Sequence, residues 1–384
     1  MPTGIDPVDL VNPVNLVSPL RRRWLGAVAV GGLLHPLGAV QAGQAPAPTR
    51  LLCAWQSSDA HHIGLLDVGA ETATVQQSLV VPTRAHGLLV EASGGLLAMA
   101  RRPGDWLVRW QPRTATRAES TQWQWVEDDR RFNGHVMASP DGRTLWTTET
   151  DLDTGQGFVA VRDVRTLAKT AEWATQGMDP HELLVLPRRL GDVPAGSLLV
   201  ANGGIPSQSE TGRAKRDLGS MDASLVALHS RTGRVLGQWR LSDPRLSIRH
   251  LAWDAASGHV GIALQAEHDD PADRQATPLL AVWNGHALHT ASGQPALAGY
   301  GGDICAQPGG GFIVSGTRAH QLAVFDAQAT WQASHPLEDA CALGNAASRW
   351  WAAGRSRVLT AAPHAPTALP ADLRLDNHWQ AVEA

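Results

Sequence analysis

Lysine, tyrosine and cysteine are scarce in this chain of 384 residues, which has only Lys169 and Lys215, one tyrosine and three cysteines. The formal net charge is −4. A protein that coats DNA or RNA needs a basic surface, so we expect no nucleic-acid partner. Charged residues make up 18% of the chain and apolar residues 43%, a composition that suits a globular core and excludes general disorder.

The three cysteines do not predict a set of disulfide bonds. Because Cys53, Cys305 and Cys341 are odd in number, at least one thiol stays unpaired or reacts between chains. A disulfide is allowed outside the cytoplasm, but nothing in the sequence requires one.

No apolar run predicts a membrane span. The stretch 25–40 is short and is interrupted by His35 and Pro36. It follows Arg21-Arg22-Arg23 and ends in small residues, as an export signal does. The arginine pair before Trp24-Leu25 resembles the twin-arginine signal, with an ordinary secretory signal as the alternative. We therefore expect a signal over residues 1–42, a linker over 43–49, and one periplasmic domain over 50–384.

Sustained helical periodicity is also missing after residue 50, where short β-type runs alternate with turn signals. A polar residue followed by an apolar strand recurs seven times, at steps of 49, 46, 69, 53, 36 and 39 residues. These ring positions are His86, His135, His181, His250, Asp303, Asp339 and His378. Repeats of this length predict a β-propeller of the WD40 or YVTN kind.

The last ring position predicts how the propeller closes. His378 lies six residues from the C-terminus, so three further strands cannot follow it. Three β-type runs, 51–56, 62–68 and 74–81, precede His86. We expect them to share a blade with the C-terminal strand, which gives an all-β, seven-bladed propeller without open edges. We expect a monomer.

Polar residues should gather at one rim of this propeller. The second strand of a blade runs antiparallel to the first, so its end lies beside the first strand's start. The residues about 14 positions after a ring residue should therefore join the rim: Arg101, Glu149, Gln265 and, after a longer turn, Asn202. Two long connections, 203–222 with Arg213 and 266–278, fall there as well.

Several segments carry a resemblance to a known family. The main ones are Arg84-Ala85-His86-Gly87, Arg101-Arg102-Pro103-Gly104, Pro180-His181-Glu182-Leu183, Asn202-Gly203-Gly204-Ile205 and Ser247-Ile248-Arg249-His250-Leu251. From about Arg84 onward they resemble the bacterial exported propeller family catalogued as domain of unknown function 1513. The chain departs from the family's aromatic-Gly-His-Gly at Asn133-Gly134-His135-Val136 and from Thr-Glu-Asn-Asp at Thr148-Glu149-Thr150-Asp151. The resemblance implies an exported propeller, encoded beside imelysin-like iron-uptake proteins and di-haem oxidoreductase-like proteins. It implies no known reaction.

The rim residues predict a binding site in the top-face funnel. The candidates are Arg84, His86, Arg101, Arg102, His135, Glu149, Asp151, His181, Glu182, Asn202, Arg213, Arg249, His250, Gln265, Asp303, Asp339 and His378. A transition metal (iron, copper or zinc) would take His135, Glu149, His181 and His250 as ligands. The arginines would instead hold carboxylates or phosphates of a small anionic ligand or chelate. Either role fits an accessory protein of iron acquisition with imelysin-like or other periplasmic partners.

Two other functions stay open. Histidine beside glutamate, as in His181-Glu182, could perform general acid-base chemistry in an enzyme. No Ser-x-x-Lys or Gly-x-Ser-x-Gly motif marks a nucleophile, however. Alternatively, the ring residues only bond neighbouring blades together, and the protein is a scaffold that acts through protein contacts.

Overall fold

Short apolar strands, separated by turns, fold into seven four-stranded antiparallel sheets. The structure is a computed structural model that describes residues 48–127, 129–206, 217–346, 348–361 and 365–382, all within one compact unit, Ala47–Ala384. The signal predicted over 1–42, most of the linker and Arg213 lie outside the described residues. The all-β, seven-bladed fold expected from the ring positions is confirmed.

Each sheet is one blade, and its strands run in order from the innermost outward. The first three blades are β4 (Ala85–Val90), β5 (Leu96–Ala100), β6 (Trp106–Gln111), β7 (Ser120–Trp125); β8 (Arg130–Ala138), β9 (Thr144–Asp151), β10 (Gln156–Asp163), β11 (Lys169–Met178); and β12 (Pro180–Val185), β13 (Leu198–Asn202), β14 (Ser224–Leu228), β15 (Val235–Trp239). The next three are β16 (Leu246–Asp254), β17 (His259–Ala266), β18 (Leu280–Trp283), β19 (Leu288–Thr290); β20 (Gly301–Ala306), β21 (Phe312–Gly316), β22 (Gln321–Phe325), β23 (Trp331–Pro336); and β24 (Leu343–Ala346), β25 (Arg349–Ala353), β26 (Arg357–Thr360), β27 (Thr367–Ala368).

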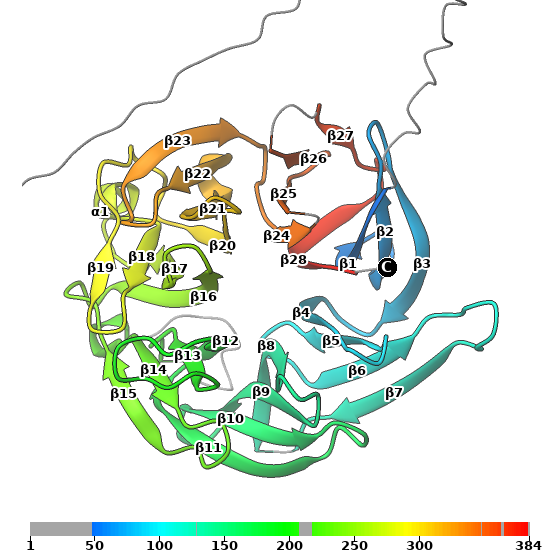
Figure 1. Ribbon diagram of the computed structural model, residues 1–384, viewed down its shortest axis with the longest axis horizontal. Coiled ribbons are helices and arrows are strands. Elements are labelled where there is room, and N and C mark those ends of the chain that lie inside the picture. Colours follow the sequence, from blue (N-terminus) through cyan, green and yellow to red (C-terminus); the bar gives the residue numbers. More distant parts are fainter. Residues whose placement is uncertain (1–47, 128, 207–216, 347, 362–364, 383–384) are drawn as a thin grey trace, which may run out of the picture. The chain divides into compact units, whose positions relative to one another are not determined.

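The seventh blade joins the two ends of the propeller. It consists of β28 (Arg374–Ala381), β1 (Thr49–Gln56), β2 (His61–Val68) and β3 (Ala73–Val81). Strand β28 pairs antiparallel with β1, with Leu51 opposite Ala381 and Gln56 opposite Arg374. The predicted closure by the C-terminal strand is therefore confirmed. The inner strands β4, β8, β12, β16, β20, β24 and β28 each contact the next, and β28 contacts β4, so they form a complete ring (Figure 1).

Helix is almost absent from the described residues. The connection 266–278, expected as a long loop, contains the short helix α1 (Pro271–Ala276). Asp270 caps it by accepting a hydrogen bond of 2.6 Å from the backbone N–H of Ala272, and Pro271 occupies the first turn, where its missing N–H costs nothing. Within the described ranges, every helix is too short or too polar to cross a lipid bilayer.

The core lies between neighbouring blades. One cluster packs β1, β2 and β3 against β4, β5 and β6, and includes the fully buried Trp106 and Trp110. Another packs β12 to β14 against β16 to β18 around Trp283. A buried indole fills the wide gap between two twisted sheets, and its truncation costs about 3–5 kcal/mol. Trp106, Trp110 and Trp283 therefore help to hold neighbouring blades together.

Candidate functional site

The ring residues reach the axis because the inner strands are irregular beside them. In β4, β8, β12, β16, β20 and β28 the antiparallel register shifts within a few residues of the ring position. Such a bulge leaves one residue of the strand without its backbone hydrogen bonds to the neighbouring strand, and it turns a side chain in a new direction. Strand β24 pairs with β25 in continuous register and contributes no ring residue.

Asp339 was expected at the sixth ring position, and that expectation is wrong. Strand β24 begins four residues later, at Leu343, and Asp339 precedes it with a positive φ of 51°. Its carboxylate lies 3.3 Å from His320 Nδ1 and 2.8 Å from Arg355 Nε, at the surface. The backbone N–H of Leu343 instead donates to Asp303 Oδ2 at 2.8 Å, so Asp303 binds the start of this strand.

Five histidines meet at the axis. They are His86 on β4, His135 on β8, His181 on β12, His250 on β16 and His378 on β28. The closest ring centroids, those of His86 and His378, are 4.4 Å apart, and those of His86 and His250 are 6.0 Å apart. The first four are buried, and the His378 side chain is 11% exposed.

Two glycines permit this approach. Gly134 has a φ of +102°, and a Cβ there would lie 2.7 Å from Cδ2 of His86, so the imidazole rests directly on the glycine backbone. A Cβ on Gly87 would collide with the carbonyl of Gly134. Any larger residue at either position would separate β4 from β8 and move His86 away from His135.

His181 and His250 belong to a hydrogen-bonded chain with a defined direction. Arg249 Nη2 donates to His181 Nδ1 at 3.2 Å, which leaves the proton of a neutral His181 on Nε2. That Nε2 lies 3.3 Å from His250 Nε2, and His250 Nδ1 lies 3.3 Å from Glu182 Oε2. Every ring nitrogen of these two histidines therefore has a partner.

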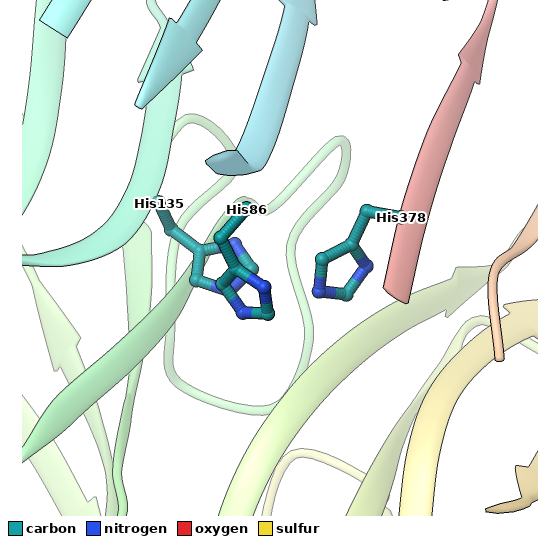
Figure 2. A group of neighbouring side chains, drawn as sticks. All are labelled: His86, His135 and His378. Atoms are coloured by element: carbon teal, nitrogen blue, oxygen red, sulfur yellow. The ribbon is translucent and has the colours of Figure 1, made fainter. Parts of the chain in front are cut away.

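The other three histidines each keep one buried nitrogen without a hydrogen-bond partner among the described residues. These atoms are His86 Nδ1, His135 Nε2 and His378 Nε2. Figure 2 shows the three imidazoles facing one another, and one nitrogen from each lies within 4.8 Å of those of the other two. His378 Nδ1 is 3.1 Å from Asp303 Oδ2, which fixes the ring orientation.

Burial sets the charge of this cluster. It lowers the pKa of His86, His135, His181 and His250 well below 6.5, and neighbouring histidines or arginines lower each further. Burial also lowers the pKa of His378, but the negative charges of Asp303, Glu182 and Asp376 outweigh it and raise the pKa overall. Burial raises the pKa of Glu182 to about 8. Four of the five imidazoles are thus neutral at pH 7, the form that binds metals.

Arginines surround the cluster on the side where the inner strands begin. Arg102 and Arg249 both pair with Asp179, the latter at 2.5 Å. Gly203 of the Asn-Gly-Gly-Ile segment covers this arrangement, since a Cβ there would lie 2.7 Å from Asp179 Oδ2. Arg84 makes a two-point ion pair with Asp376. Gln265 donates to the backbone carbonyl of Gly301 at 3.1 Å and lies beside Arg101 and Arg102 at a small cavity of the same mouth.

Glu149 was expected beside His135, and this expectation is wrong. The bulge in β8 places Phe132, not His135, opposite Glu149. The carboxylate is fully buried inside the blade, where it accepts 2.5 and 2.8 Å hydrogen bonds from Arg162 Nη2 and Thr147 Oγ1. It is therefore not a ligand at the axis. The expected metal ligands His135, Glu149, His181 and His250 cannot all bind one ion.

Two more candidates lie away from the histidines. Asp151 accepts from Arg130 Nη1 at 2.5 Å and from the turn residue Thr154, at the surface of the blade. Asn202 donates to the carbonyl of Thr175 at 2.9 Å, inside the neighbouring sheet. Both stabilise local backbone.

Asp179 and Tyr300 are site residues that sequence reasoning missed. Asp179 joins Arg102 to Arg249, and Tyr300 lines the same mouth with the Arg318 guanidinium 4.4 Å from its ring centroid. Asp179 directly precedes Pro180-His181, and a carboxylate next to a ring histidine was the only available signal. Tyr300 is the chain's single tyrosine.

The three cysteines are free and buried. Burial raises the pKa of each thiol, that of Cys341 to about 12. They therefore pack as apolar groups and supply no thiolate at neutral pH.

Comparisons with known proteins agree with the fold. Among solved structures, the Dos1 propeller is similar with a TM-score of 0.54 and 12% identity, over 84% of this chain and 81% of that chain. Apo AztD from Citrobacter koseri aligns with a TM-score of 0.48 and 9% identity, over 88% and 98%. At such identities the likeness to the Dos1 propeller shows the fold alone. No curated protein matches the chain. The model of a family described as a protein of unknown function (DUF1513) matches residues 79–382, so the chain belongs to the DUF1513 family.

Proposed function

We propose that this protein binds a transition-metal ion at the axis of the propeller, through His86, His135 and His378. The observation that carries the proposal is that each of these imidazoles buries one nitrogen without a partner among the described residues. A buried polar atom left unsatisfied costs about 1–3 kcal/mol. Three such nitrogens, on imidazoles that can each bring one nitrogen within 4.8 Å of the other two, are explained if an ion binds between these histidines when the protein works.

The donor set suits iron, copper or zinc, since all three accept imidazole. His86 and His135 are already neutral, and a bound ion would displace the proton of His378, whose pKa is raised. The contact from Asp303 to His378 resembles the carboxylate that orients a metal-binding histidine and increases its basicity. His181 and His250 have both nitrogens engaged, so they support the site and do not supply its primary ligands.

The test is the metal content of matched double variants after equilibrium dialysis against Zn²⁺, Cu²⁺ or Fe²⁺. The wild type should retain one ion per chain, and His135→Ala/His378→Ala none. His286→Ala/His289→Ala removes two exposed histidines on an outer edge and should retain the ion. A cluster variant that still binds one ion but melts at a lower temperature would show that these histidines only hold the blades together.

A third variant tests the orienting role of the carboxylate. Asp303→Asn keeps the size of the side chain but removes the charge next to His378 Nδ1. Loss of such an orienting partner typically costs 10–100-fold in metal affinity. An unchanged affinity would remove Asp303 from the site.

The proposed setting is the periplasm, where the protein would assist iron acquisition beside imelysin-like proteins. The support is the arginine-rich segment before residue 25 and the family resemblance. Affinity purification of the tagged protein from periplasm, with the His135→Ala/His378→Ala variant in parallel, tests it. Recovery of an imelysin-like protein with the wild type would support the partnership, and its absence would contradict it.

A further inference from the structure

The mouth of the axis on the side where the inner strands begin is lined by positive charge. A cavity of about 20 Å³ there is bounded by Arg101, Arg102 and Arg249, which lie over His86, His181 and His250. Gln265, Tyr300 and Asn377 complete the lining, which has no carboxylate among the described residues. The mouth therefore presents N–H donors above the histidines.

The positive charge of Arg102 and Arg249 is only partly neutralised. Arg102 and Arg249 share the single carboxylate of Asp179. Arg249 is 2% exposed, and its Nε has no hydrogen-bond partner among the described residues. Burial and the nearby charge of Arg102 lower the pKa of Arg249, while Asp179 acts in the opposite direction. Two buried guanidinium groups that share one carboxylate leave an excess positive charge, which is costly to bury, and an anion in the cavity would offset that cost.

The opposite side of the cluster has a different character. A cavity of about 210 Å³ there is lined by Glu182, Asp303, His135 and His378 together with apolar side chains such as Leu88 and Met137. The Asp303 carboxylate repels anions there, whereas Glu182, with its pKa raised to about 8, is mostly protonated at pH 7. The cluster thus separates a cavity lined by carboxyl groups from one lined by arginines.

We infer that the arginine-lined mouth binds an oxyanion, a carboxylate or phosphate group of a small ligand, with one oxygen directed at His86, His181 and His250. Guanidinium groups match the geometry of both oxyanions. A cavity of this volume admits about one water-sized group. One oxygen therefore enters while the rest of the ligand stays outside.

The first experiment measures anion binding alone, on chelator-treated full-length protein. Inorganic phosphate and malonate are titrated separately by calorimetry. We expect one of them to bind at one site per chain, and the probe that binds distinguishes phosphate from carboxylate recognition. Arg102→Gln should weaken this binding by about 10-fold or more, as expected for loss of a charged hydrogen bond. Arg231→Gln, at an exposed outer turn, should bind as the wild type does.

Two results would overturn the inference. One is that neither probe binds the wild type, and the other is that Arg102→Gln binds as tightly as the wild type. If Arg102→Gln lowers the melting temperature so far that it is unfolded during the titration, Arg101→Gln takes its place, since Arg101 lines the same cavity.

A second experiment measures coupling, and this part rests on the proposed metal site. An oxygen facing His86 can complete the coordination of an ion held there, so the probe and Zn²⁺ should each tighten the binding of the other by the same factor. Equal probe affinity with and without bound Zn²⁺ would contradict the coupling. If Zn²⁺ does not bind at all, the metal proposal fails while the first experiment still decides on the anion.

Discussion

Acidification should destabilise the metal-free protein because four histidines are buried in their neutral form. Their pKa values lie well below 6.5 in the folded chain, whereas an unfolded histidine titrates near 6.5. As the pH falls through about 6.5, the unfolded state binds protons that the folded state refuses, so stability is lost. From pH 7.0 to 5.5, linkage gives about 1.3 kcal/mol for each such histidine, or about 5 kcal/mol for four.

His378 works in the opposite direction. Its pKa is raised in the folded state, so its contribution is fully present below the unfolded pKa and is lost as the pH rises through the folded pKa. Between pH 7.0 and 5.5, His378 reduces the loss of unfolding free energy by less than about 1 kcal/mol. Glu182 offsets about 2 kcal/mol more, because burial raises its pKa to about 8 and it keeps its proton in the folded state, whereas an unfolded glutamate is ionised over this interval. The net expectation is a loss of about 2–3 kcal/mol.

Urea unfolding at pH 7.0 and 5.5, after removal of metal with a chelator, measures this loss. His135→Gln removes one neutral imidazole, so its loss should be smaller than that of the wild type by about 1.3 kcal/mol. His286→Gln, at an exposed position, should leave the loss unchanged. A wild-type loss below about 1 kcal/mol, or equal losses in wild type and His135→Gln, would refute the account of a buried neutral cluster.

Three further predictions concern the closure, the arginine pairing and the signal. Deletion of residues 376–384 removes most of β28, which opens an edge on β1, so we expect aggregation or a large fall in melting temperature, and a stable monomer would contradict the closure. Asp179→Asn leaves Arg102 and Arg249 without their carboxylate and should cost about 3–5 kcal/mol of unfolding free energy, while a cost below about 1 kcal/mol would show that the pairs are not needed. Replacing Arg21, Arg22 and Arg23 by lysine keeps the charge but removes the arginine pair, so periplasmic accumulation should fall, and unchanged export would indicate the general secretory route.

The fold could be predicted because the repeat is marked by one residue type at one place. A polar residue before an apolar inner strand gives six of the seven blades their position, and the place of His378 near the C-terminus predicts the closure. Asp339 shows the limit of this pattern. Asp339-Ala-Cys-Ala has nearly the same letters as Asp303-Ile-Cys-Ala, but letters alone do not determine where β24 starts.

The residues that form the site were harder to predict from the sequence. Counting residues across a hairpin placed Glu149 beside His135, and the bulge in β8 invalidates that count. Asp179 lies far in sequence from both Arg102 and Arg249, and only the contact between neighbouring inner strands brings them together. His181 and His250 have partners at both ring nitrogens, whereas His86, His135 and His378 each have one nitrogen without a partner among the described residues. This difference depends on side-chain positions, which cannot be predicted from the spacing of residues in the sequence.

X-ray absorption spectroscopy of the protein loaded with one equivalent of Zn²⁺ tests the central claim most directly, because it reports the atoms bound to the ion. The account predicts nitrogen ligands at about 2.0–2.1 Å with the outer-shell scattering of about three imidazoles. That signal should be lost in His135→Ala/His378→Ala and kept in His286→Ala/His289→Ala. A spectrum with oxygen ligands only, or one that the cluster variant leaves unchanged, would contradict a metal site at the axis.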